Sequence, residues 1–92
     1  MSGIHLSGTL VCRDAREAAI VTAALPEHVR LTRAEPGCVS FEVATTDDPL
    51  VWTVEESFVD AAAFRSHQQR VVGSAWGRAT AGIERRYEVE GL

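Results

Sequence analysis

The stretch EESFVDAAAFRSHQQR, residues 55–70, contains two side chains that could share a proton. Glu56 interrupts a row of apolar residues, and His67 follows in an alanine-rich segment. An imidazole titrates near neutral pH and can exchange a proton in either tautomer, and a neighbouring carboxylate could orient it. His67 and Glu56 are therefore the candidate catalytic pair, with His67 as the acid/base group.

Aromatic side chains are the candidate walls of a pocket around this pair. Rings can stack on a planar molecule, and the polar tips of Trp and Tyr can hydrogen-bond to it. The candidate substrate-binding residues are Trp52, Phe41, Phe58, Phe64, Trp76 and Tyr87.

Each candidate also has a structural interpretation. His67 could be a histidine at the edge of the core that donates to a backbone carbonyl. Glu56 could form an ion pair, for example with an arginine, that joins a strand to a helix. The aromatic residues could be ordinary core, and Trp76, whose direction the sequence leaves open, could belong to a hydrophobic lid or a dimer contact.

Four further polar residues are expected to have no catalytic part. Arg33 and Glu35 are interpreted as setting the end of a helix and the following turn. His5 and His28 have no supporting constellation, so they are expected at the surface or in an interface.

The first half of the chain predicts a strand followed by a helix. Residues 4–12, IHLSGTLVC, alternate in the manner of a strand. Asp14 and Glu17 have the form of an N-terminal capping pair, and Pro36-Gly37 would end the helix. Pro26 predicts a kink or a restart. The apolar stripe of this helix would be Ala18, Val21, Leu25, Val29 and Thr32.

The second half predicts a hairpin, a helix and a last strand. Residues 38–58 hold two alternating runs around a turn rich in Thr, Asp and Pro. Asp60 is a candidate cap for a second helix, with His67 at the edge of its apolar stripe. Residues 83–90, IERRYEVE, predict the last strand. Shared faces would be Val39, Phe41 and Val43; Leu50, Trp52, Val54, Glu56 and Phe58; Phe64, Val71 and Ala75; and Ile83, Arg85, Tyr87 and Val89.

The resulting order, β-α-β-β-α-β, predicts an α+β protein with a ferredoxin-like antiparallel sheet, as one domain over residues 1–92. Both helices would cover one face of the sheet. The other face would include Val11, Val51 and Thr53, and a chain this short buries little surface by itself. A second copy is expected to cover that face, as a homodimer.

Composition excludes several kinds of partner. All nine basic residues are scattered arginines and the net charge is −4, so no nucleic-acid partner is expected. The chain has neither a signal-peptide pattern nor a run of eighteen apolar residues, so we expect a cytoplasmic protein without a membrane partner. Cys12 and Cys38 stand alone, which predicts buried thiols rather than a metal site or a disulfide.

Three segments carry a family resemblance. TRAEPGCVSFEV (residues 32–43), the Asp48-Pro49 turn and EESFVDAAAFRSH (residues 55–67) resemble the antibiotic biosynthesis monooxygenase (ABM) family, small dimeric α+β barrel proteins that include quinol monooxygenase-like members. The resemblance spans nearly the whole chain, which departs from the family pattern at Pro26 and Glu55. The matching positions are Arg33, Glu35 to Cys38, Glu56, Phe58, Asp60, Phe64 and His67.

The resemblance implies oxygen insertion into a small phenolic or quinol-like aromatic molecule, with dioxygen as co-substrate and no flavin, haem or metal. The absence of a dinucleotide-binding glycine motif is compatible with this function. One alternative is a non-catalytic module of the same fold that binds a small ligand. Another is a haem-degrading relative; such proteins use a histidine, a tryptophan and an asparagine, whereas this chain has no asparagine, and His67 stands where those relatives resemble a tryptophan position.

Overall fold

The strand order of the sheet is β2-β3-β1-β4, with every neighbouring pair antiparallel. This is the arrangement in a computed structural model that describes residues 3–92. The ferredoxin-like prediction is therefore confirmed. The elements are β1 (Ile4–Val11), α1 (Ala15–Arg33), β2 (Cys38–Thr45), β3 (Val51–Phe58), α2 (Ala61–Val72), α3 (Ala75–Ala79) and β4 (Glu84–Glu90).

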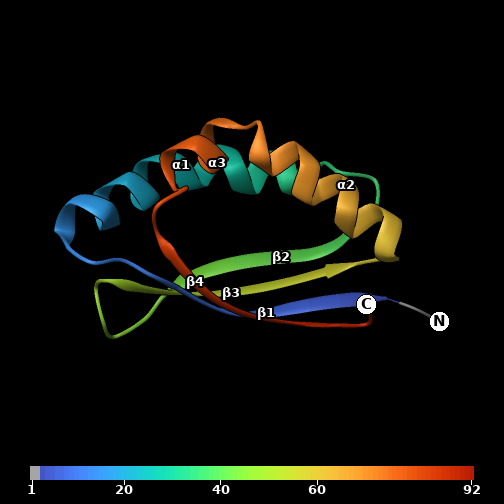
Figure 1. Cartoon of the computed structure of the whole chain (residues 1–92), viewed down its shortest axis with the longest axis horizontal. Helices are drawn as coiled ribbons and strands as arrows, with labels where there is room; N and C mark the ends of the chain where they lie inside the picture. Colours follow the sequence, from blue (N-terminus) through green and yellow to red (C-terminus); the bar gives the residue numbers. More distant parts are fainter. Residues whose placement is uncertain (1–2) are drawn as a thin grey trace.

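The helices form one layer over one face of the sheet, and the opposite face is uncovered (Figure 1). The period of two along the strands explains which residues face the helices. In β1 these are Ile4, Leu6 and Leu10, and β3 contributes alternate residues that include Glu56. The buried apolar core lies between the layers, so Glu56 projects into that space.

Helix α1 begins as predicted but does not restart at Pro26. The carboxylate of Asp14 accepts a hydrogen bond from the N–H of Glu17 at 3.0 Å, which caps the helix. A single helix then continues through Pro26. Val21 before the proline and Thr32 after it are both fully buried. Packing on both sides therefore holds one helix despite the backbone hydrogen bond that a proline cannot make.

Two local predictions are wrong. Val39 does not share a face with Phe41, because the β2–β3 register shifts between Cys38 and Ser40, and its side chain is 64% exposed. Ala75 is exposed and belongs to the short helix α3, which the sequence reading did not separate from α2. The oxygen of Ser74 caps α3 by accepting from the N–H of Gly77 at 3.0 Å, and Trp76 is thereby turned into the core.

The cysteines are expected to titrate as two free thiols. Cys12 follows β1 and its N–H donates to the carbonyl of Leu50, whereas Cys38 pairs with Phe58 at the other end of β3. Cys12 is buried as predicted, but Cys38 is only partly buried, and burial raises the pKa of both thiols. Thiol counting on protein denatured without reductant should find two groups. A count of zero would contradict this strand order.

Candidate active site

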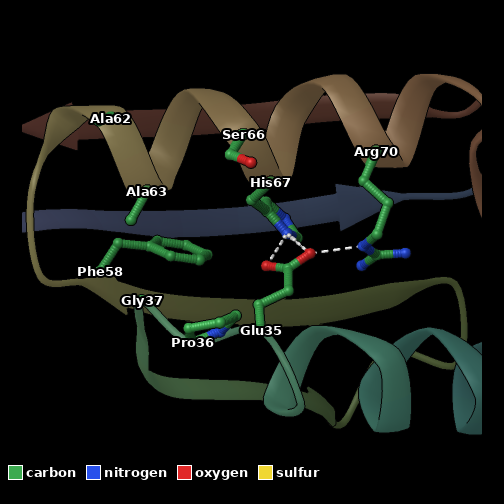
Figure 2. A pocket seen from close by; sticks show the side chains of 9 residues that line it. All are labelled: Glu35, Pro36, Gly37, Phe58, Ala62, Ala63, Ser66, His67 and Arg70. Atoms are coloured by element: carbon green, nitrogen blue, oxygen red, sulfur yellow. Dashed lines mark hydrogen bonds and ion pairs between the residues drawn. The ribbon is translucent and has the colours of Figure 1, made fainter.

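His67 is the centre of the candidate site. It lies on the sheet-facing side of α2, one turn after Phe64, and only 3% of its surface is exposed. Its Nδ1 lies 3.0 Å from Oε1 and 3.3 Å from Oε2 of Glu35 (Figure 2). The imidazole is therefore oriented by a carboxylate, but from the turn after α1 rather than from β3.

Glu35 is a site residue that the sequence analysis missed. Its backbone has the expected part in the turn, because its N–H donates to Thr32 and its carbonyl accepts from Cys38. Its carboxylate, however, lies between His67 and the guanidinium of Arg70 (Figure 2). Arg70 also donates to the hydroxyl of Thr32 at 3.0 Å. His67 and Arg70 are three residues apart on one helix face, and that spacing is the signal that could have indicated a shared partner.

Glu56 lies on the other side of the imidazole. Its residue is 6% exposed, and within residues 3–92 its Oε1 has no hydrogen-bond partner. That oxygen lies 3.7 Å from Nε2 of His67, beyond the range of a good hydrogen bond. No arginine partner is found for Glu56 in the described part of the chain, so the ion pair considered as its structural role is absent there.

Burial sets the protonation of this pair. The pKa of Glu56 is raised to about 7, chiefly because burial disfavours the charged carboxylate and secondarily because Glu35 is negative. The pKa of His67 is lowered, because desolvation outweighs the attraction of Glu35 for the charged imidazole. Near neutral pH the site therefore has a carboxyl group that can gain or lose a proton beside an imidazole that favours the neutral form.

The inner cavity lies between the helices and the sheet, and both residues of the candidate pair line it together with aromatic side chains. It has a volume of about 50 Å³ and is lined in part by Glu56, the residue whose Oε1 is unpartnered. Its lining residues are His28, Phe41, Val43, Val54, Glu56, His67, Gln68, Val71, Trp76, Arg85 and Tyr87. Of the six aromatic candidates, Phe41, Trp76 and Tyr87 line this cavity, so the direction of Trp76 that the sequence left open is inward.

The other three aromatic candidates lie elsewhere. Trp52 and Phe64 are buried in the hydrophobic core and line neither this cavity nor the groove described next. The ring of Phe58 lies 4.9 Å from that of His67, on the side away from the inner cavity. These three residues support the pocket by packing, as core aromatics do.

His28 is a second residue that the sequence analysis missed. It was expected at the surface or in an interface, but it is buried, with 5% of its surface exposed. Its ring stacks on Trp76 with 4.4 Å between centroids and meets the ring of Phe41 edge-on at 5.3 Å. Its position one turn before the buried Thr32 was the available signal. Desolvation lowers the pKa of His28 to about 3, so it lines the cavity as a neutral ring.

The outer groove lies on the Nδ1 side of His67, where Figure 2 shows the side chains of Glu35 and Arg70. Its volume is about 410 Å³, and the carboxylate of Glu35 and the guanidinium of Arg70 lie in its wall. The full lining is Glu35, Pro36, Gly37, Phe58, Ala62, Ala63, Ser66, His67 and Arg70. His67 lines both spaces, so its imidazole is the contact between the inner cavity and the outer groove.

The fold and the site together define a small ferredoxin-like α+β protein with a buried carboxyl group and a buried imidazole close together in an aromatic cavity. The chain belongs to the antibiotic biosynthesis monooxygenase family, whose pattern it matches over residues 11–77. This match covers more than half of the chain and confirms the family resemblance. No curated protein matches the chain.

Solved structures share the fold at low sequence identity. MupZ from Pseudomonas fluorescens has a TM-score of 0.80 and 19% identity, over 98% of this chain and 68% of that one. A candidate antibiotic biosynthesis monooxygenase from Nitrosomonas europaea has a TM-score of 0.77 and 16% identity, over 99% and 90% of the two chains. Rv0793 from Mycobacterium tuberculosis has a TM-score of 0.76 and 19% identity, over 99% and 95%.

Two kinds of feature are absent from residues 3–92. In this part of the chain no helix combines the length and apolar character needed to cross a membrane. No group of three or more His, Cys, Asp and Glu side chains is placed there to hold a metal ion.

Replacing Glu56 with glutamine is expected to stabilise the protein more at high pH than at low pH. The folded-state pKa of about 7 lies above the ordinary 4.5, so the folded state holds the extra proton and loses stability as pH rises between these values. Glutamine is neutral at both pH values, so the variant does not lose this stability. The loss in the wild-type protein amounts to roughly 3 kcal/mol over the pH range between the two pKa values. Urea unfolding at pH 5 and pH 8 measures the difference between the two proteins. An unchanged difference would contradict the buried, unpartnered carboxyl group.

Proposed function

We propose that the protein is a cofactor-independent monooxygenase that oxidises a small aromatic quinol or phenol in the inner cavity. The observation that carries this proposal is the buried Oε1 of Glu56, which has no partner and faces Nε2 of His67 across 3.7 Å. A buried polar group without a partner costs free energy, so its retention in an aromatic cavity is explained by a bound molecule that completes its hydrogen bonding. Membership of a monooxygenase family supports the same class of reaction.

The reaction needs a base, a dry space and a cation. Removal of a phenolic or enolic proton gives an electron-rich anion, which passes one electron to dioxygen. The two radicals combine to a peroxide anion, which takes up one proton to become a hydroperoxide. The hydroperoxide loses water to leave a carbonyl, so one oxygen atom enters the product and the other leaves as water. The Glu56–His67 pair supplies the base. Arg85 lines the cavity and is held by the carbonyls of Thr80 and Ile83, at 2.8 and 2.9 Å, where it can stabilise developing negative charge.

A substrate ring requires the inner cavity to enlarge. Ligand pockets usually measure about 300–1,000 Å³, whereas this cavity measures about 50 Å³. The stacked rings of His28 and Trp76 separate it from a groove of about 240 Å³ between α1 and α3, and both rings line both spaces. Because α3 is a five-residue helix, displacement of Trp76 is the simplest way to join the two spaces. A planar substrate would then take the place of the indole against His28.

The test is an aerobic assay against a panel of quinols and anthrone-like phenols, in which oxygen uptake and tryptophan fluorescence are recorded together. Oxygen uptake above the spontaneous rate, with quenching of Trp76, supports the proposal. Quenching by panel members without any oxygen uptake would instead identify a ligand-binding module and overturn the enzymatic proposal. The variant Trp76→Phe removes one of the two tryptophans and assigns the fluorescence change.

We also propose that the uncovered sheet face forms a homodimer. On that face Val11 and Val51 are half-buried and form the last pair of the β1–β3 ladder, and the nearby Thr53, which pairs with Thr9, is exposed. His5 lies on the same face, where it contacts Ser57 and Glu55, each at 2.9 Å. Isologous pairing would bury these side chains without disturbing the active site on the opposite face.

The dimer is expected at micromolar concentration, and Thr53→Arg should convert it to a monomer. An arginine at this register position would meet its symmetry mate or lie unpaired in the interface, and burying an unpaired charge is costly. Light scattering measures both proteins. A wild-type monomer at micromolar concentration would contradict the proposed interface, and Arg16→Ala, on the exposed surface of α1, is the control that should remain a dimer.

A further inference from the structure

We infer that Glu35 and His67 form a proton path that carries the substrate proton from Glu56 in the inner cavity to the outer groove. This inference rests on the proposed function, because it assigns Glu56 as the group that meets the substrate and His67 as the relay behind it. Glu35 is then a positioning residue and the proton acceptor at the surface.

Within residues 3–92, His67 is the only residue that lines both the inner cavity and the outer groove. Its Nε2 faces Glu56 on the cavity side, and its Nδ1 faces Glu35 on the groove side. The side chain of Glu35 is the most exposed of the three, at 17%, whereas those of Glu56 and His67 are 8% and 3% exposed. The path therefore leads from two buried side chains to Glu35 in the wall of the outer groove, and Figure 2 shows its last step, from His67 to Glu35.

The contacts of Glu35 fix the tautomer that a relay needs. Arg70 donates to Oε2 of Glu35, and Arg70 is itself held by the hydroxyl of Thr32. A carboxylate in this position accepts the Nδ1–H of a neutral imidazole, which leaves the lone pair on Nε2 directed toward Glu56. The charged or titratable groups around His67 are Glu35, Arg70, Glu56 and, on α1, His28, which remains neutral.

One proton moves from the substrate to the outer groove in four transfers. Glu56 takes a proton from the bound phenol or enol and becomes a neutral carboxylic acid. It passes that proton to Nε2 of His67, which requires the 3.7 Å separation to shorten to about 3 Å. Nδ1 releases its own proton to Glu35, and Glu35 gives it to water in the outer groove. The peroxide anion formed with dioxygen later takes a proton back along the same groups, from groove water through Glu35 and His67 to Glu56. This return restores the original tautomer, and no electrons are transferred along the path.

Two variants of Glu35 separate its two proposed roles, which are to fix the tautomer of His67 and to accept the proton. Glu35→Gln keeps an oxygen that can accept the Nδ1–H, so the tautomer is retained, but an amide cannot take the proton. Glu35→Ala removes both functions and opens space in the groove beside His67. Glu42→Gln, an exposed carboxylate paired with Arg33, is the charge-matched control.

With the best substrate from the quinol panel, Glu35→Gln should lower kcat by about 10²-fold, the lower end of what acid/base groups contribute, with KM nearly unchanged. Glu35→Ala should lose a similar factor and regain activity as formate or acetate is added, because a small carboxylate can occupy the vacated space. Glu42→Gln should behave as wild type. A Glu35→Gln variant with wild-type kcat, or a Glu35→Ala variant insensitive to both anions, would overturn the path.

If no panel compound is oxygenated, that result contradicts the proposed function but not the proton path. Nitrogen-15 NMR of the histidines tests the path independently of activity. His67 should be the Nδ1–H tautomer in wild type and in Glu35→Gln, and a mixture in Glu35→Ala. Its Nε2 resonance should follow the titration of Glu56 near pH 7, and Glu56→Gln should abolish that response. An Nε2–H tautomer in wild type, or an Nε2 resonance indifferent to Glu56→Gln, would contradict the path.

Discussion

Turnover of an accepted quinol is expected to fall by about 10²–10⁴-fold when His67 is replaced with alanine, because acid/base groups typically contribute this much. The imidazole contacts the carboxylates on both sides of it, so its loss leaves Glu56 without a neighbour that can take its proton. Steady-state oxygen uptake measures the effect. His5 lies outside the site but on the proposed dimer face, so His5→Ala is unsuitable as a control. Glu42→Gln serves as the control instead.

Stability has to be measured beside turnover. His67 is buried and partnered, so its truncation leaves a cavity and removes a partner of Glu35. A second variant, Glu56→Gln, nearly preserves side-chain volume and is expected to fold at least as well as wild type near neutral pH. It should show a loss of turnover in the same range, about 10²–10⁴-fold. Full activity in Glu56→Gln, or in a folded His67→Ala protein, would show that the substituted residue has a structural role and not a catalytic one.

Replacement of Gly8 with alanine is expected to destabilise the protein by at least about 3 kcal/mol, the upper end of the cost of strained backbone, with steric overlap in addition. Gly8 lies at the middle of β1 with a φ of 155°, which side chains rarely adopt. A Cβ at this position would lie 2.1 Å from the carbonyl oxygen of Arg86 and 2.9 Å from Cα of Tyr87. Strand β4 would have to move away from β1, and with it Arg85 and Tyr87 of the inner cavity.

Urea unfolding measures this change, and the chain offers a matched control. A Cβ at Gly82 would meet nothing within 4 Å, so Gly82→Ala should change the free energy of unfolding little. Equal stabilities of the two alanine variants would contradict the close approach of β4 to β1. A Gly8→Ala protein that remains folded should also lose activity, because the wall formed by β4 is displaced.

Local sequence patterns were enough to predict the sheet and the helix starts. The alternation around Glu56 placed it in an inward row, and Asp14 and Asp60 cap the two helices as expected. These features depend on neighbours within a few residues, which the sequence displays directly. The bulge at Val39 and the separate helix α3 depend instead on strand pairing and on packing around Trp76, so local patterns did not show them.

The half of the site that was missed depends on contacts between distant segments. Glu35 reaches His67 and Arg70 across 32 and 35 residues of sequence, and nothing local distinguishes it from an ordinary turn residue. His28 was expected at the surface or in an interface because no constellation of residues in the sequence supported a role for it, whereas in the structure its ring stacks on the buried ring of Trp76. The sequence identified the inward carboxylate and imidazole but assigned the orienting role to Glu56, whereas in the structure Glu35 contacts the imidazole.

The most direct test of the proposed chemistry is the fate of isotopically labelled dioxygen. Protein treated with chelator and shown to be free of flavin and haem is incubated under ¹⁸O₂ with the best substrate of the panel, and the product is analysed by mass spectrometry. One labelled oxygen atom per product molecule is expected, at a rate that falls in Glu56→Gln and is unchanged by the chelator. A product without label, or activity that returns only when a metal or flavin is added back, would contradict the proposed chemistry.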